Sequence, residues 1–289
     1  MLMKIHLVTY ATPRFRHRQW ILGLSARLNG VVDTVTAWTP SQLLKAGFAQ
    51  RCKNISLSER GSGYWAWKPF IIDAKLKEVP DGDLVFYCDV GRRFPYKRLD
   101  RPLTPLLEWM EKNRQNFLPG VRIGWRGPLA FWTKRDAFVL AGMDHPQAHD
   151  SPTVQASFSL WRASTASRKF VSQWLEWCSQ HQLISDDTST CGLPELPGFH
   201  EHRHDQSLLT LCCLKLRAKS LDLGDRSLPI NTRDPAQVIA HLYHTPRPHQ
   251  GLPCRVLAAG AFALELLERI FRKCVKFGTD SPAHPLAHD

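Results

Sequence analysis

Residues 81–91 read DGDLVFYCDVG, and this stretch decides the fold class. The preceding proline and the Asp-Gly pair are a typical turn signal. The apolar run over 84–90 then predicts a buried strand, with Asp89 near its carboxyl end. Because ligands of open α/β sheets bind outside the carboxyl ends of the strands, we interpret an acid at this place first as functional.

Strand and helix patterns alternate on the amino-terminal side of this stretch, which indicates a parallel sheet and the α/β class. Residues 4–9 and 31–38 predict strands, and residues 19–28, 39–47 and 67–77 predict helices. In the first of these helices, the residues expected in the core are Ile21, Leu22, Leu24 and Leu28.

The carboxyl-terminal side continues with the same two kinds of pattern. We expect strands or extended segments at 120–125, 129–134 and 154–163, helices at 103–113, 135–140, 167–181 and 205–215, and a loop at 188–204. The helix at 167–181 is amphipathic, with Phe170, Val171, Trp174 and Trp177 along one side.

The chain has 289 residues, of which 43% are hydrophobic, and this suits one large α/β domain with a short accessory segment. Its formal net charge of +12 favours anionic partners such as nucleotide diphosphates and anionic lipid. A basic surface without a specific partner is the alternative. The sequence has neither zinc-finger spacing nor a long Lys/Arg block, so we expect no nucleic-acid partner.

The eight cysteines form no C-x-x-C pair, so we expect free thiols and a cytoplasmic protein. We assign residues 1–250 to the catalytic domain, 251–277 to an amphipathic helix and 278–289 to a mobile tail. That helix either packs on the domain or lies on an anionic membrane surface, which would place the protein peripherally on the inner face of the membrane.

Asp89 is the first candidate site residue. A carboxylate at a strand end is a ligand for Mg²⁺ or Mn²⁺, which fill their remaining coordination sites with phosphate oxygens and water. Such a cation neutralises a departing nucleoside diphosphate. The alternative is an aspartate that caps a helix.

The segment RGSGYWAWKPF at 60–70 is the second candidate. Its two glycines suggest close approach of the backbone, and Arg60 and Lys68 place positive charge near a helix start, which is a natural anion site. An ordinary hydrophobic loop with two solvated cations is the alternative.

Two histidine-rich segments are further candidates. In HEHRHDQSLL at 200–209, Asp205 and Gln206 are expected to enter the cleft and hold sugar hydroxyls, whereas a surface loop or a three-histidine zinc site are the alternatives. In AHLYHTPRPHQG at 240–251, His241, His244 or His249 is a candidate metal ligand and Arg247 a candidate phosphate contact, and a polar surface loop is equally compatible with the pattern.

Four ordered blocks carry a resemblance to a known family: IHLVTYA at 5–11, RGSGYWAWKPFII at 60–72, DGDLVFYCDVG at 81–91 and HRHDQSLL at 202–209. Together they resemble bacterial glycosyltransferases of the GT-A fold that build surface polysaccharides such as capsule and lipopolysaccharide. The resemblance extends over about residues 4–250. It implies a Rossmann-type mixed central sheet flanked by helices, Mn²⁺ or Mg²⁺ as cofactor, and a nucleotide-sugar donor.

The resemblance also implies roles for single residues. The family's Asp-x-Asp motif is here Asp89-Val90-Gly91, so the metal ligands expected are Asp89 and the distant His244. The residues expected to bind the donor are Tyr10, Arg60, Lys68, Asp89 and Gln155. The HDQ block is similar to the Asp-Gln pair of retaining galactosyl- and glucosyltransferases, which assigns catalysis to Asp205 and Gln206 and favours retention.

The expected function is therefore metal-dependent transfer of a hexose from a nucleotide-diphosphate sugar to a saccharide or glycolipid acceptor. The missing second aspartate supports an alternative, a non-catalytic protein that binds nucleotide or carbohydrate with a degenerate metal site.

Overall fold

The computed structural model describes residues 3–91, 99 and 102–222. All of them belong to one unit, Met1–Pro246. The helix expected at 251–277, the tail at 278–289 and the candidate ligand His244 lie outside the described residues. Within the described ranges, no helix has the length and apolar character needed to cross a bilayer.

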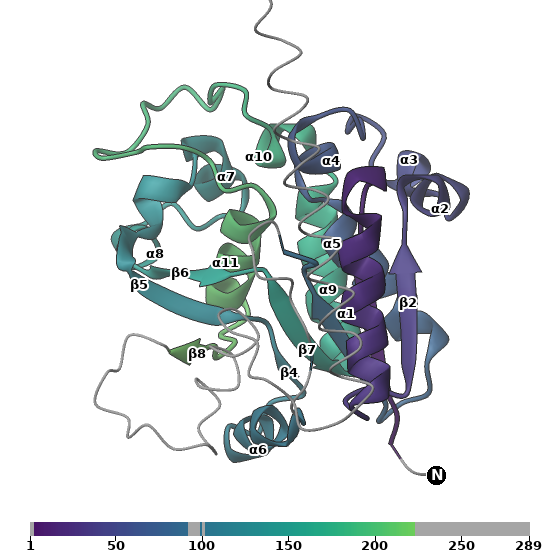
Figure 1. Ribbon diagram of the computed structural model, residues 1–289. Coiled ribbons are helices and arrows are strands. Elements are labelled where there is room, and N and C mark those ends of the chain that lie inside the picture. Colours follow the sequence, from purple (N-terminus) through teal and green to yellow (C-terminus); the bar gives the residue numbers. More distant parts are fainter. Residues whose placement is uncertain (1–2, 92–98, 100–101, 223–289) are drawn as a thin grey trace, which may run out of the picture. The chain divides into compact units, whose positions relative to one another are not determined.

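A five-stranded mixed sheet forms the centre of the fold (Figure 1). The parallel strands β2 (Thr34–Trp38), β1 (Ile5–Tyr10) and β3 (Leu84–Cys88) lie in that order. Next to β3, β7 (Phe158–Arg162) runs antiparallel, and β4 (Phe117–Leu118) pairs antiparallel with β7 at the edge. The predicted α/β class with a mixed central sheet is therefore confirmed.

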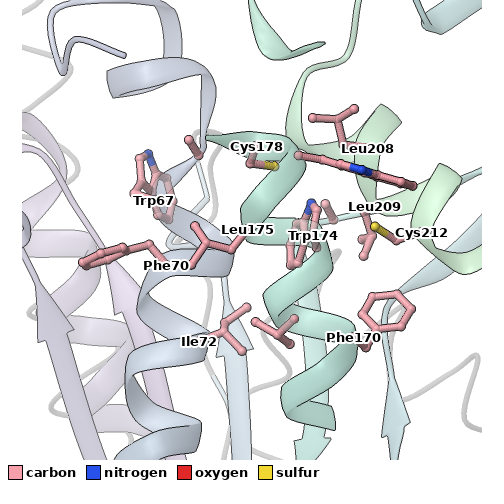
Figure 2. Close-up of a cluster of buried hydrophobic side chains, with 14 of the residues drawn as sticks. Trp67, Phe70, Ile72, Phe170, Trp174, Leu175, Cys178, Leu208, Leu209 and Cys212 are labelled. Carbon is pink, nitrogen blue, oxygen red and sulfur yellow. The ribbon is translucent and has the colours of Figure 1, made fainter. Parts of the chain in front are cut away.

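Helices cover both faces of this sheet. One face carries α5 (Trp67–Glu78), α9 (Thr165–Cys178) and α11 (Asp205–Lys215), and the other carries α1 (Arg16–Leu28) and α6 (Thr104–Lys112). Side chains alternate along a strand, so Val85 and Tyr87 of β3 join the first helices, whereas Phe86 joins the second. Figure 2 shows how Trp174 of α9 packs in the cluster on the first face.

A second sheet stands beside the first, with the order β6 (Pro152–Gln155), β5 (Val121–Pro128) and β8 (Leu221–Asp222). The shorter elements are the 3₁₀ helices η1 (Pro13–Phe15) and η2 (Leu129–Trp132), and α2 (Pro40–Lys45), α3 (Phe48–Arg51), α4 (Arg60–Tyr64), α7 (Arg135–Leu140), α8 (Pro146–His149) and α10 (His181–Ile184). Residues 188–204 contain no helix or strand, as predicted.

Two segments expected to be extended differ from the prediction. Residues 154–163 form two strands of different sheets, β6 and β7, because the chain turns at Ala156 and Ser157. The segment 129–134 is not a strand, since η2 occupies its first four residues, directly after Pro128.

The core prediction for α1 is half right. Ile21 and Leu22 are buried, but Leu24 is only half-buried and Leu28 is 51% exposed. A helix turns by about 100° per residue, so leucines that follow Leu22 by two and six positions lie on another side of the helix. The helix itself begins at Arg16, three residues earlier than expected.

Candidate active site

Three of the sequence-predicted residues meet at the carboxyl end of β3. Asp89 follows the strand and has the same parity as Val85 and Tyr87, so its side chain lies on the face covered by α5 and α11. Lys68 is in the first turn of α5, and its Nζ lies 2.9 Å from Oδ2 of Asp205, the first residue of α11. The same Nζ lies 3.8 Å from Oδ1 of Asp89.

Backbone and hydroxyl groups fix this triad. The hydroxyl of Tyr87 donates to Oδ1 of Asp89. The break between β6 and β7 supplies two carbonyls, of which Ala156 accepts a hydrogen bond from Lys68 Nζ at 3.1 Å and Ser157 accepts one from the Asp89 amide at 2.9 Å. The turn that divides the predicted strand is therefore part of the site.

The three residues differ in exposure to solvent, and the pKa values of Lys68 and Asp205 are shifted. The side chains of Lys68 and Asp205 are 6% and 4% exposed, whereas that of Asp89 is 29% exposed. Burial lowers the pKa of Lys68, but the carboxylates of Asp205 and Asp89 outweigh it, so the net pKa is raised and the ammonium keeps its charge. Burial raises the pKa of Asp205 to about 7, although Lys68 opposes the shift.

The carboxylate of Asp89 is thus the accessible group of the triad. Lys68 and Asp205 lie behind it, and because Asp205 titrates near neutrality the net charge of the three groups is either zero or −1 at physiological pH. Lys68 and the hydroxyl of Tyr87 therefore hold the Asp89 carboxylate in a fixed position at the solvent-accessible side of the triad.

The segment before α5, which includes the short element α4, is a left-handed turn and not a regular right-handed helix. All five residues from Gly61 to Trp65 have positive φ angles, between 51° and 88°. Glycine at position 61 is required, because a Cβ atom there would overlap the Trp65 ring. The indole Nε1 of Trp67 donates to the carbonyl of Gly61 at 3.0 Å, which ties the turn to the start of α5.

Tyr10 and Arg60, both predicted to bind the donor, lie around this turn. Tyr10 is only 5% exposed; its ring packs on Trp67 with centroids 4.1 Å apart, and its hydroxyl bonds to that of Ser62 at 2.7 Å. Arg60 is exposed and bridges Asp186 at 3.4 Å and Glu201 at 3.3 Å. Tyr10 therefore supports the turn, and Arg60 links it to the loop before α11.

Of the three histidines in residues 200–204 only His200 is exposed, so they do not form a cluster open to sugar. His202 and His204 are buried, and each bonds a backbone carbonyl of α10 at 2.8 Å. Burial lowers the pKa of both rings, most strongly that of His202, so both are neutral at pH 7. His204 stacks on Tyr64 and Trp65, and this contact couples the left-handed turn to the residue preceding Asp205.

Gln155 and Gln206 flank the triad along the chain. Gln155 ends β6 directly before Ala156, and Gln206 follows Asp205 in the first turn of α11. Both side chains are partly exposed.

A cavity of about 630 Å³ opens at the carboxyl ends of β1 and β2. Its lining includes Arg16 at the start of α1 and Thr39, Ser41 and Gln42 around the start of α2. None of these residues is among the sequence-predicted site residues, although their position directly after two parallel strands is a usable signal.

Sequence reasoning also missed Tyr87. A residue two positions before Asp89 on the same strand faces the same side, so the alternation of β3 could have identified it as a partner.

The fit of these residues to Mn²⁺ or Mg²⁺ is limited to one carboxylate. Asp89 offers partly exposed carboxylate oxygen, which such cations prefer. Among residues 3–91, 99 and 102–222, no group of three or more His, Cys, Asp or Glu side chains gathers as a metal site. The arrangement suits a cation whose other ligands are phosphate oxygens and water, and not a site built from protein alone.

No protein-family model matches the sequence, and a search of curated proteins finds no match.

Proposed function

We propose that the chain is a glycosyltransferase of the GT-A type, which moves a hexose from a nucleotide-diphosphate sugar to a saccharide or glycolipid acceptor. The observation that carries the proposal is the contact of Lys68 with both Asp89 and Asp205. These residues come from three of the four family-like sequence blocks, lie far apart in the chain, and meet at the carboxyl end of a central strand.

The cavity at the ends of β1 and β2 supports a nucleotide donor. Arg16 gives it a positive charge suited to phosphate, and Thr39, Ser41 and Gln42 provide polar atoms suited to ribose or base. In this proposal the cavity holds the nucleoside, while Asp89 lies toward the diphosphate. Tyr10 then contributes to donor binding by fixing the turn at Ser62.

Asp89 would hold the divalent cation, which supplies positive charge to the departing diphosphate. Lys68 adds a second positive charge behind Asp89 and keeps its carboxylate in place. The bond between sugar C1 and the β-phosphate oxygen breaks, and the diphosphate leaves with the electron pair. The acceptor hydroxyl oxygen then bonds to C1, and its proton passes to the oxygen of the departing diphosphate.

Asp205 and Gln206 have different positions relative to the donor in this scheme. The carboxylate of Asp205 is 4% exposed and pairs with Lys68, so it acts through the lysine and holds its ammonium in position. Gln206 is partly exposed in the same helical turn and is the better candidate for direct contact with the sugar.

A screen of nucleotide sugars for metal-dependent hydrolysis tests the proposal. We expect the purified protein to release nucleoside diphosphate with Mn²⁺ or Mg²⁺, and Asp89→Asn to reduce the rate by about a hundredfold or more, as expected for a lost charge contact in the transition state. The matched control is Asp81→Asn, since the Asp81 side chain is 71% exposed in the turn before β3. Equal rates in both variants would remove Asp89 from the mechanism.

One observation favours a second candidate, a non-catalytic binder of nucleotide or carbohydrate. Gly91 stands where the family has its second aspartate, and one partly exposed carboxylate is a weak metal site. Calorimetric titration with nucleoside diphosphates, with and without Mn²⁺, separates the two functions. Metal-independent binding together with no hydrolysis of any donor would support the binder.

A further inference from the structure

The outer face of α1 combines large apolar side chains with positive charge. Its buried side includes Ile21 and Leu22, of which Leu22 belongs to the cluster that packs on the sheet. The exposed or half-buried residues of the other side are Arg16, His17, Trp20, Leu24, Arg27 and Leu28. This is the face on which two leucines expected in the core are found instead.

The apolar residues of this outer face form a line along the helix. Trp20, Leu24 and Leu28 are spaced by four residues, and side chains at this spacing are neighbours on a helix surface. Trp20 is 59% exposed and Leu28 is 51% exposed. Among the large hydrophobic residues described, these two and Leu44, also 51% exposed, have the highest exposures. An ordinary solvent face of a helix carries polar residues at such positions.

The charged residues of α1 are all basic. The helix reads RHRQWILGLSARL and contains neither Asp nor Glu. Arg16 lies at the start of the apolar line and Arg27 near its end. A tryptophan and leucines between arginines are the composition of a surface that binds the headgroup region of an anionic bilayer.

We propose that the outer face of α1 docks this protein on an anionic lipid bilayer. An anionic membrane is the expected partner because its charge is opposite to that of the protein. The whole chain carries a net charge of +12, and α1 has no acidic residue that would repel lipid headgroups. Trp20 inserts its ring at the interface, while Arg16 and Arg27 contact the headgroups. The apolar line of Trp20, Leu24 and Leu28 favours a bilayer over a nucleic acid, because the charged phosphate backbone would not bury these side chains.

This orientation has a consequence for the cavity at the ends of β1 and β2. Arg16 belongs both to the docking face and to the cavity lining, so docking brings the cavity rim to the lipid surface. A membrane-held substrate would therefore enter beside α1. Docking itself does not require the proposed glycosyl transfer and is tested without it.

Sedimentation of the full chain with lipid vesicles tests the proposal. We expect binding to vesicles of phosphatidylglycerol and phosphatidylcholine, weak binding to pure phosphatidylcholine, and release by salt. The variants Trp20→Ser/Leu28→Ser and Arg27→Glu should each bind the anionic vesicles about tenfold more weakly. The control Leu140→Ser replaces a leucine that is 47% exposed on α7, and it should bind like the parent chain.

Circular dichroism and thermal unfolding of each variant show whether the fold is kept, since the replaced side chains are exposed. Blue-shifted Trp20 fluorescence on vesicle addition, measured against the Trp20→Ser background, gives a second readout. The proposal is overturned if the α1 variants bind as tightly as the parent. It is equally overturned if only charge reversal within the predicted amphipathic helix at 251–277 releases the protein, or if the α1 variants instead change its oligomeric state in size-exclusion chromatography.

Discussion

Replacing Lys68 by Met removes the positive charge that lies between two carboxylates. At an effective dielectric constant of about 20, the ammonium gains about 6 kcal/mol from Asp205 at 2.9 Å and about 4 kcal/mol from Asp89 at 3.8 Å. Much of this gain offsets the cost of burying Lys68. Breaking a buried pair typically costs about 3–5 kcal/mol, because the remaining charge stays buried without its partner.

The cost of Lys68→Met depends on pH in a defined direction. The folded-state pKa of Asp205 is about 7, above its ordinary value of 3.8, so its protonated form stabilises the fold and this stability is lost as pH rises toward 7. Without Lys68 that pKa is higher still. The variant therefore continues to lose stability above pH 7, by about 1.4 kcal/mol per pH unit relative to the parent.

Urea unfolding at several pH values between about 6 and 8.5 measures this effect, and the difference in unfolding free energy should grow by about 2 kcal/mol over that interval. The double variant Lys68→Met/Asp205→Asn should show no such growth, because it has no carboxyl group at position 205. Lys75→Met is the matched control, since Lys75 is on the same helix and 6% exposed but pairs with the exposed Glu78. A constant or shrinking difference for Lys68→Met would refute the assigned charge coupling.

Two further substitutions test other parts of the fold. Gly61→Ala should cost about 2–5 kcal/mol in urea unfolding, from about 1–2 for a left-handed alanine and the rest from displacing Trp65. Gly30→Ala, at a similar φ of 62° with open space around it, should cost only the backbone part, and equal losses would contradict the packing argument. Asp83→Asn should cost about 1–3 kcal/mol at neutral pH, because Asp83 accepts hydrogen bonds from His6 and from the Lys4 amide. The hydrogen bond from His6 is the main cause that lowers the pKa of Asp83, so this stabilisation diminishes as pH falls below about 4, and a loss of stability that stays constant as pH falls through that range would argue against the assignment.

Local patterns were sufficient to predict the elements that carry the site. The turn before β3, its apolar run and the acid at its end place Asp89 correctly, and α11 begins at Asp205 as expected. Such features depend on residues within a few positions of each other. The burial of Phe170, Val171, Trp174 and Trp177 on one side of α9 follows from helical periodicity in the same way.

Contacts between distant segments were not predictable from these patterns. The continuous β pattern of 154–163 does not show that its middle must turn so that the Ala156 and Ser157 carbonyls meet Lys68 and Asp89. Nor does a leucine reveal whether its side of a helix meets the sheet, as Leu24 and Leu28 demonstrate. Both are tertiary effects that override a local preference.

The left-handed turn at 61–65 connects backbone strain to the proposed chemistry. Three of its residues, Ser62, Tyr64 and Trp65, carry side chains, and each costs about 1–2 kcal/mol in this conformation. A total of about 3–6 kcal/mol is comparable to the net stability of a domain, so the surroundings must hold the turn firmly. They do so through the hydrogen bond of Ser62 with Tyr10 and the stacking of Tyr64 and Trp65 on His204.

These restraints act on the two chain segments that form the triad. The turn ends at Trp65, two residues before α5 begins at Trp67 and three before Lys68, and His204 immediately precedes Asp205. The stacked rings therefore fix the start of α5 against the start of α11, and this sets the distance between the lysine and its carboxylate partner. Strain of this kind persists at sites where precise placement has a function, which is a reason to seek the chemistry of this protein at Asp89 and not elsewhere on the sheet edge.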